Sequence, residues 1–255
     1  MEPVGPSDIA LTAQQCKAAS VAYTYNDPVI FAEYAIDTAI ACREAGIKNV
    51  AVTAAYIHPE PAHEFFPLMD AANVDLKAFT DSFYHRLCGG HLGPVLDMLA
   101  YIRHETNCWL EITTLLIPGC NDSPTEIGQL ARWVATELGS DVPLHFSAFH
   151  PDWKMQEIPA TPHDTLRRSR QIAQDAGLQH VYLGNVHDAE GGSTYCTQCH
   201  TPLIVRDWYD IRYYSVDPFG QCPNCHTPLS GRYAGQLGGD GKAFGPKRIP
   251  VRFSR

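Results

Sequence analysis

Long hydrophobic runs are missing from this 255-residue sequence. Runs such as Leu115–Ile117 are far shorter than the roughly 20 residues that a membrane-spanning helix needs. The first residues, Met1 to Val4, contain neither a basic start nor an apolar stretch, so they do not resemble a signal peptide. We therefore expect a cytoplasmic protein that does not enter a membrane.

Positive charge is also scarce, because 19 Lys and Arg residues stand against 28 Asp and Glu residues, for a formal net charge of −9. A field of this sign repels phosphate backbones, so general nucleic-acid binding is disfavoured. The exception is the segment 241–255, which holds five basic residues and no acidic one. This segment is either a solvated tail or a binding arm.

A glycine-rich phosphate-binding fingerprint is absent after every strand-like segment. Six short apolar, β-branched runs alternate with helical stretches, and they cover residues 20–25, 48–53, 73–79, 109–117, 143–149 and 179–184. Strands that alternate with helices predict parallel βαβ units. The runs start 25–36 residues apart, which favours a (β/α) barrel. A doubly wound sheet is the alternative, and the missing fingerprint weakens it.

Helix boundaries are marked by a few residues. Pro28 suits the first helical position, and Gly46 suits the end of the same helix. Thr161 and Asp164 predict the start of a later helix that ends at Gly177.

The alternating pattern stops after Gly184, and residues 193–234 are dense in Cys, Gly, Pro and Tyr. We therefore predict three parts: a partial (β/α) barrel over residues 1–190, a small module over 191–234, and a basic tail over 235–255. The fold class is α/β, with a parallel barrel followed by a small zinc ribbon.

Four of the nine cysteines form two CxxC pairs, Cys196 with Cys199 and Cys222 with Cys225. The pairs are separated by 22 residues, and each is followed by the same four residues, His-Thr-Pro-Leu. Two such pairs can place four thiolates tetrahedrally around one ion, and four protein ligands make a structural site. Zinc is the favoured metal, with rubredoxin-like iron as an alternative. The CxxCH spelling also matches c-type haem attachment, which would require export.

Polar residues gather at the predicted strand ends, where a (β/α) barrel carries its chemistry. Asn26 and Asp27 follow the first visible strand, and His150 follows the fifth. Asp75 and Lys77 are two residues apart, so a strand points both side chains to one face. Simpler interpretations exist: Asp27 could cap the helix at Pro28, and the Asp75–Lys77 pair could be a solvated edge pair.

A family resemblance is visible in five segments, which are YTYNDPVIFAEY (residues 23–34), NVDLKAF (73–79), LLIPGCNDS (115–123), HFSAFHPD (145–152) and GNVHD (184–188). In this order they closely resemble the radical S-adenosylmethionine (SAM) enzyme of the AmmeMemoRadiSam system, a family related to pyruvate formate-lyase activating enzymes. The resemblance covers nearly all of residues 8–255, including both CxxC pairs and RIPVR at 248–252.

The resemblance implies a partial (β/α) barrel in which a 4Fe–4S cluster reduces SAM to a 5′-deoxyadenosyl radical. It places Asn26 and Asp27 where relatives hold the amino group of SAM, with Asp27 in place of the more usual Glu. It places Asp75 and Lys77 at the ribose and carboxylate of SAM, and His150 near the adenosine. It also suggests Memo-like partner proteins, but it names no substrate.

One departure from the family is large: the CxxxCxxC motif that binds the cluster is absent. In the family this motif follows the first barrel strand, upstream of the helix that begins here near Ser7. We therefore expect that the first strand and the cluster ligands lie on a missing N-terminal segment. The strand that would pair with it should have an open edge and exposed inward-facing residues such as Val21.

The sequence leaves three functional hypotheses. The first is a radical SAM enzyme, or the C-terminal part of one, which is inactive alone because the cluster ligands are missing. The second is a decayed relative or a non-catalytic module that binds partner proteins. The third, a zinc hydrolase, is weak because no HExxH motif occurs and four thiolates close the zinc site.

Overall fold

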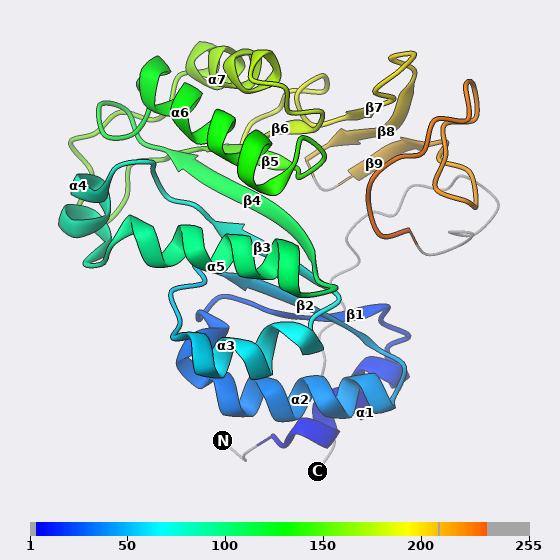
Figure 1. Ribbon diagram of the computed structural model, residues 1–255. Helices are drawn as coiled ribbons and strands as arrows, with labels where there is room; N and C mark the ends of the chain where they lie inside the picture. Colours follow the sequence, from blue (N-terminus) through cyan, green and yellow to red (C-terminus); the bar gives the residue numbers. More distant parts are fainter. Residues whose placement is uncertain (1–3, 209, 234–255) are drawn as a thin grey trace. The chain divides into compact units, whose positions relative to one another are not determined.

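The computed structural model describes residues 4–208 and 210–233, so the basic segment 241–255 lies outside the described residues. Within the described residues, six strands form one sheet in the order β1-β2-β3-β4-β5-β6, and three strands form a second sheet in the order β7-β8-β9 (Figure 1). No helix in this part of the chain is both long and apolar enough to cross a membrane.

The six strands of the first sheet follow the predicted runs closely. They are β1 (Ser20–Tyr23), β2 (Lys48–Thr53), β3 (Ala71–Asp75), β4 (Trp109–Leu116), β5 (Leu144–Ala148) and β6 (Val181–Gly184). The pairs β1–β2, β2–β3, β3–β4 and β5–β6 are parallel, which confirms the predicted α/β class. The third strand was predicted to reach Phe79 but ends at Asp75. Burial still alternates through residues 76–79, so the apolar pattern continued beyond the strand pairing.

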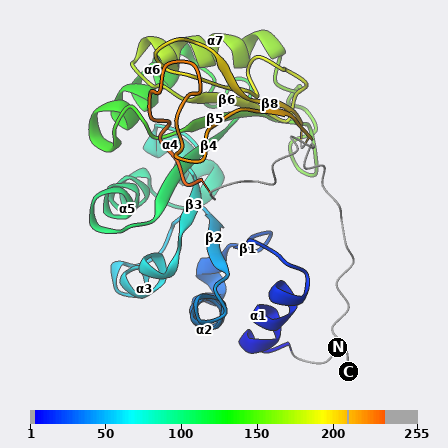
Figure 2. The same ribbon diagram turned by 90° about the vertical axis from the view of Figure 1, so that its right-hand side faces the viewer.

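The described residues divide into two compact units, 4–113 and 114–233. Helical segments of the first unit are α1 (Pro6–Gln15), η1 (Pro28–Phe31), α2 (Ala32–Glu44), α3 (Pro59–Phe65), η2 (Phe66–Leu68), α4 (Asp81–Phe83), η3 (Tyr84–Cys88) and α5 (Leu92–Glu105). In this unit α2, α3 and α5 lie on one side of the strands (Figure 2).

The helix-facing side of the first unit is its buried core. Tyr23 Oη donates a hydrogen bond to Asn49 Oδ1 (2.9 Å), and Asn49 Nδ2 donates to the carbonyl of Ala39 in α2 (3.0 Å). Val21 belongs to this side too, because it packs against a cluster of α1 and α2 residues. The expectation that Val21 faces inward was therefore wrong by one position, because alternate strand residues point to opposite faces.

The predicted helix boundaries are largely confirmed in the first unit. Pro28 opens the short 3₁₀ segment η1, which leads into α2. Gly46 follows the end of α2 with a φ of 73°, a left-handed conformation that favours glycine.

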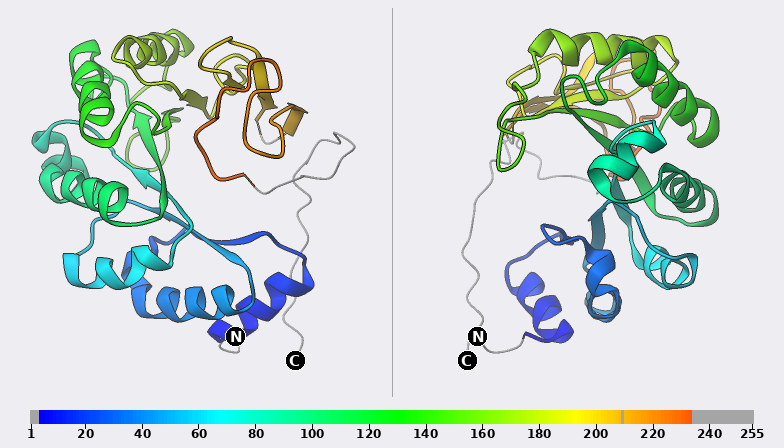
Figure 3. Two further views of the ribbon diagram at one scale, coloured as in Figure 1. Left: turned by 45° about the vertical axis from the view of Figure 1, so that its right-hand side comes forward. Right: turned by 90° about the vertical axis from the view of Figure 1, so that its left-hand side faces the viewer.

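The second unit contains α6 (Pro124–Trp133), η4 (Val134–Leu138) and α7 (His163–Asp175), which lie side by side over their strands (Figure 3). Thr161 does not cap α7. Its Oγ1 instead donates to the carbonyl of Leu116 (2.6 Å) and accepts from the backbone N–H of Phe149 (2.8 Å). This side chain therefore joins the ends of β4 and β5.

The outer edge of β6 is covered by other parts of the second unit. The N–H of Leu183 donates to the carbonyl of Gly191 (3.0 Å), and Arg170 Nε donates to the carbonyl of Val181 (3.1 Å). At the other end of the sheet order, β1 pairs with β2 alone among the described residues.

The second sheet consists of β7 (Thr194–Tyr195), β8 (Pro202–Asp207) and β9 (Asp210–Tyr214), which pair antiparallel. A small core beneath it contains Leu203, Ile204, Val216 and Leu229 together with Cys196 and Cys222. We call residues 193–233 the ribbon.

Candidate functional site

The four predicted cysteine ligands come together in the ribbon. Their sulfur atoms all lie within 4.8 Å of one another. The Sγ atoms of Cys196 and Cys225 are 3.5 Å apart, and those of Cys199 and Cys222 are 3.6 Å apart. A tetrahedral zinc site with Zn–S bonds of about 2.3 Å has S–S edges of about 3.8 Å, so the four sulfurs fit one ion.

The two CxxC turns are near-copies in structure as well as in sequence. The N–H of His200 donates to the carbonyl of Cys196 (3.0 Å), and the N–H of His226 donates to that of Cys222 (2.9 Å). His200 and His226 have φ angles of 58° and 59°. The sequence repeat therefore builds two matching turns that approach the metal position together, and both histidines are turn residues.

A threonine hydroxyl contacts the thiol of the second cysteine in each CxxC pair. Thr201 Oγ1 lies 3.2 Å from Cys199 Sγ, and Thr227 Oγ1 lies 3.2 Å from Cys225 Sγ. The contact with Thr201 lowers the pKa of the Cys199 thiol to about 5. Burial, together with the neighbouring thiols of Cys199 and Cys196, raises the pKa of the Cys222 thiol to about 11 against the backbone N–H groups that lower it. A bound divalent metal supplies a positive charge that favours the thiolates.

The remaining five cysteines are scattered along the chain. Cys16 and Cys88 are exposed, Cys42 and Cys108 are buried, and Cys120 is half-buried. Among the described residues, the ribbon cysteines are the one group of three or more Cys, His, Asp or Glu residues close enough to share a metal. None of the other five cysteines belongs to a CxxxCxxC motif.

Asp27 holds the turn after β1. It is the N-cap of η1, where Oδ1 accepts from the N–H of Val29 (3.3 Å). Thr53 Oγ1 donates to the same oxygen (2.6 Å), and the N–H of Ala54 donates to Oδ2 (2.9 Å). The capping interpretation of Asp27 is therefore confirmed. Asn26 beside it is exposed.

Asp75 and Lys77 form an ion pair at the end of β3. Both side chains are half-buried and lie on the face opposite the helices, because the alternate residues Val74 and Leu76 are fully buried. The backbone N–H of Lys77 donates to the hydroxyl of Tyr84 (3.0 Å), which fixes this stretch of chain. Burial raises the pKa of Tyr84, so its hydroxyl stays protonated at neutral pH.

More polar residues share this helix-free face of the first unit. Asn73 lies opposite Glu111 in the β3–β4 register, and Asp75 lies opposite Thr113. Glu111 Oε1 accepts a hydrogen bond from Trp109 Nε1 (3.1 Å). Asn73 stands two residues before Asp75 in β3, so strand alternation places its side chain on the same face.

His150 belongs to the second unit, where it follows β5 and is exposed. The neighbouring β6 ends at Gly184, and Asn185 Nδ2 then donates to the carbonyl of Ala148 (3.2 Å). The ends of β5 and β6 therefore lie side by side, each followed by a polar loop.

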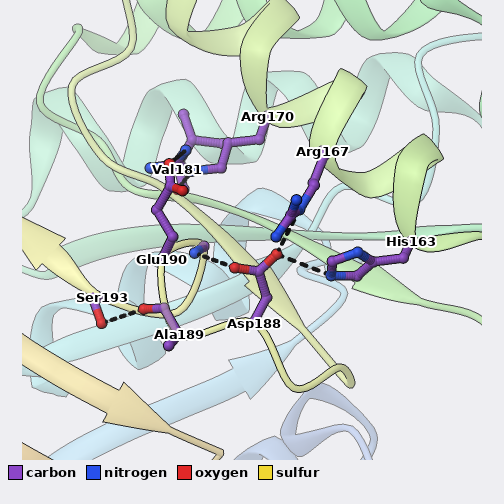
Figure 4. A network of polar contacts seen from close by, with 9 residues as sticks. His163, Arg167, Arg170, Val181, Asp188, Ala189, Glu190 and Ser193 are labelled. Carbon is purple, nitrogen blue, oxygen red and sulfur yellow. Dashed lines mark hydrogen bonds and ion pairs between the residues drawn. The ribbon is translucent and has the colours of Figure 1, made fainter.

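Asp188, the last residue of the GNVHD segment, is a buried carboxylate with several partners (Figure 4). Its Oδ2 lies 2.9 Å from His163 Nε2 and accepts from Arg167 Nε (3.0 Å), and its Oδ1 accepts from the N–H of Gly191 (2.8 Å). Burial alone would raise the pKa of Asp188, but the contacts with Gly191 and Arg167 hold it below the ordinary carboxyl value. Asp188 therefore fastens the loop after β6, which leads into the ribbon, to α7.

No family model matches this chain. The uncharacterized protein MJ0808 of Methanocaldococcus jannaschii is 37% identical over 212 residues, which are 83% of this chain and 62% of that protein. The chain thus spans less than two thirds of this curated relative.

Several solved structures share the fold. A domain of pyruvate-formate lyase-activating enzyme from Bacteroides vulgatus superposes with a TM-score of 0.58 at 18% identity, over 66% of this chain and all of that domain. SuiB of Streptococcus suis bound to S-adenosylmethionine superposes with a TM-score of 0.59 at 16% identity, over 73% of this chain and 45% of SuiB. A radical SAM methyltransferase from Sphaerobacter thermophilus superposes with a TM-score of 0.55 at 16% identity, over 68% of this chain and 53% of that enzyme. The predicted α/β fold with a partial parallel (β/α) barrel is thereby confirmed.

Proposed function

We propose that this chain is the SAM-binding part of a radical SAM enzyme of the AmmeMemoRadiSam system. One observation carries the proposal: the Asp75–Lys77 ion pair lies on the helix-free face at the end of β3. This pair occurs in a fold shared with SuiB, which was solved bound to SAM. Chemistry in such folds gathers at the carboxyl ends of parallel strands.

The polar side chains at these strand ends fit SAM as a ligand. SAM carries a carboxylate, an ammonium group, a sulfonium and ribose hydroxyls. Lys77 offers a cation for the carboxylate, and Asp75 offers acceptors for the ribose hydroxyls. Asn26 and Asp27 would hold the ammonium group, with Asp27 using lone pairs not taken by Thr53 and Ala54. We assign His150 to the adenosine by resemblance to the family.

The 255 residues contain no CxxxCxxC motif, so they offer no cluster-binding loop of the family's kind for a 4Fe–4S cluster. We propose that the three thiolates for the cluster lie on a segment outside these 255 residues or on a separate chain. The longer relative leaves room for such a segment, because this chain covers 62% of its length. Memo-like proteins are the partners that the AmmeMemoRadiSam assignment suggests, and a cytoplasmic location is consistent with free thiols.

We assign zinc to the ribbon cysteines. The four sulfurs are spaced for one ion, and four thiolates leave no open position for a reacting ligand. The site therefore has a structural role, in which the metal holds the two CxxC turns together.

SAM binding tests the proposal directly. We expect isothermal titration of the zinc-loaded chain to show saturable SAM binding that Lys77→Met weakens roughly 10- to 100-fold, because a charged hydrogen bond is lost. Lys48→Met is the matched control, since Lys48 forms an exposed ion pair with Asp70 (2.9 Å) in the same unit. Equal SAM affinity of the wild type and Lys77→Met would reject the assignment of the pair.

A further inference from the structure

Arg206, in β8 of the ribbon, is a half-buried cation without an acidic partner among the described residues. Its Nη1 donates to the carbonyl of Gly192 (3.3 Å) and to Thr194 Oγ1 (2.8 Å). Its Nε and Nη2 make no side-chain hydrogen bond to the described part of the chain. A partly desolvated guanidinium usually pairs with an anion, and this protein has a formal net charge of −9. The missing partner therefore needs an explanation.

The guanidinium is held over an aromatic platform. Arg206 Cζ lies 5.7 Å from the centre of the Tyr182 ring in β6. The hydroxyls of Tyr182 and Thr194 are hydrogen-bonded at 2.9 Å, so Thr194 contacts both members of the stack. The centre of the His145 ring, on neighbouring β5, lies 5.0 Å from the centre of the Tyr182 ring. The side chain of Arg206 is thus oriented before any ligand arrives.

Two irregularities in the ribbon aim these side chains. The β7–β8 register shifts between Thr194 and Tyr195, and the β8–β9 register shifts between Val205 and Arg206. Such bulges redirect a side chain and often occur beside functional sites. Both ribbon residues that contact Tyr182 therefore lie at a register shift.

The platform lies on the helix-free face of the second unit. His145 and Tyr182 are opposite one another in the β5–β6 register, and the next pair along the face is Ser147 and Gly184. A Cβ atom on Gly184 would come within 2.8 Å of Ser147 Oγ, so a larger residue there would require the Ser147 side chain to move. Beyond the aromatic pair, toward the strand ends, the face therefore carries only small side chains.

We propose that Arg206, with Tyr182 and His145, binds an oxyanion group of a small ligand, either a carboxylate or a phosphate. The planar guanidinium recognises such groups through two parallel N–H donors, and Nε with Nη2 is a suitable pair. This site uses none of the residues assigned to SAM, and it gives the ribbon a binding role in addition to its metal.

The test uses the zinc-loaded, full 255-residue chain with inorganic phosphate and benzoate as probes. Isothermal titration and the ¹⁵N–¹H signal of the Arg206 Nε group report binding. We expect saturable binding of at least one probe, which Arg206→Gln weakens at least tenfold. Arg206→Lys keeps the charge without the planar fork, so it should bind more weakly than the wild type and more tightly than Arg206→Gln.

Arg212→Gln is the matched control, because Arg212 lies on neighbouring β9 and pairs with Asp207 (2.9 Å). It should bind the probes like the wild type. Binding of phosphate alone or of benzoate alone identifies the oxyanion class. Absence of saturable binding, or equal loss in the Arg206→Gln and Arg212→Gln variants, would overturn the proposal. Zinc content checks that the ribbon of each variant is folded. If Arg206→Gln does not fold, the affinity of Arg206→Lys for the probes is compared with that of the wild type instead, and equal affinity overturns the proposal. The assay needs neither SAM nor a cluster, so its result is independent of the proposed function.

Discussion

The hydroxyl of Thr53 donates a 2.6 Å hydrogen bond to the carboxylate of Asp27, which ties the end of β2 to the turn after β1. Thr53 Oγ1 also accepts from the N–H of Ala55 (2.9 Å), and the side chain is buried. One hydroxyl group therefore helps to hold two neighbouring strand ends together, alongside the N–H of Ala54.

Replacing Thr53 by Val keeps the side-chain volume and removes both hydrogen bonds. We expect the free energy of unfolding to fall by about 1–3 kcal/mol, because buried polar partners are left unsatisfied. Urea denaturation measures this change. Thr136→Val is the control, since Thr136 is exposed and bonds within its own helix, and it should change stability by less than about 0.5 kcal/mol. Similar losses in both variants would contradict the role of Thr53.

Asp188 predicts an acid-dependent part of the stability. Its pKa is depressed in the folded protein by Gly191 and Arg167 against the effect of burial. A depressed folded pKa stabilises the protein above the unfolded pKa, which is about 3.9 for Asp. That contribution is lost as the pH falls through the lower folded value.

The comparison of Asp188→Asn with the wild type tests this sign. The wild type should be more stable from neutral pH down to about pH 4, and the two unfolding free energies should converge at lower pH. Asp175→Asn, at an exposed position at the end of α7, should leave a wild-type pH profile. A stability gap between Asp188→Asn and the wild type that stays constant to about pH 2 would show that the carboxylate charge is not the cause.

The ribbon should contain one zinc ion per chain after expression without added metal. Elemental analysis should show this ratio, and Cys199→Ala should lose the metal and destabilise the ribbon, because folding and metal binding are linked. Cys88→Ala is a control at an exposed cysteine outside the ribbon, and it should keep its zinc. Iron or haem in the wild-type chain would refute the zinc assignment.

Anaerobic treatment with iron and sulfide should build no 4Fe–4S cluster on this chain, because its sequence contains no CxxxCxxC motif. With SAM and a reductant, the chain should then form no 5′-deoxyadenosine. Addition of a segment or a partner chain that supplies CxxxCxxC should give both properties if the radical SAM assignment holds. Formation of 5′-deoxyadenosine by the 255-residue chain alone would disprove the prediction.

Local sequence signals predicted much of this structure. Alternating β-branched runs gave the strands, because each buries a short apolar stretch, and the CxxC repeat gave the ribbon cysteines, because its spacing fixes turn geometry. The capping role of Asp27 also followed from its place before Pro28. These features depend on residues that are close together in the chain.

Features that depend on distant parts of the chain were missed. The strand register that brings Asn73 opposite Glu111 is set by tertiary packing. The hydrogen bonds of Thr161 to Leu116 and Phe149 join residues up to 45 positions apart. The contact of Arg206 with the Tyr182 ring could not be predicted for the same reason, because two register shifts in the ribbon direct it.

The covered outer edge of β6 has a consequence for how copies of this protein meet. Arg170 and Gly191 occupy hydrogen-bonding groups of that edge, so another strand cannot extend the six-stranded sheet there without displacing them. The β1 edge is the opposite end of the strand order. Strand pairing between copies can therefore use only the β1 edge. Two copies that pair β1 with β1 leave no free edge for a third copy, so such an assembly ends at a dimer. Head-to-tail stacking into a fibre would need the β6 edge at every contact, so the covered edge blocks it from the start.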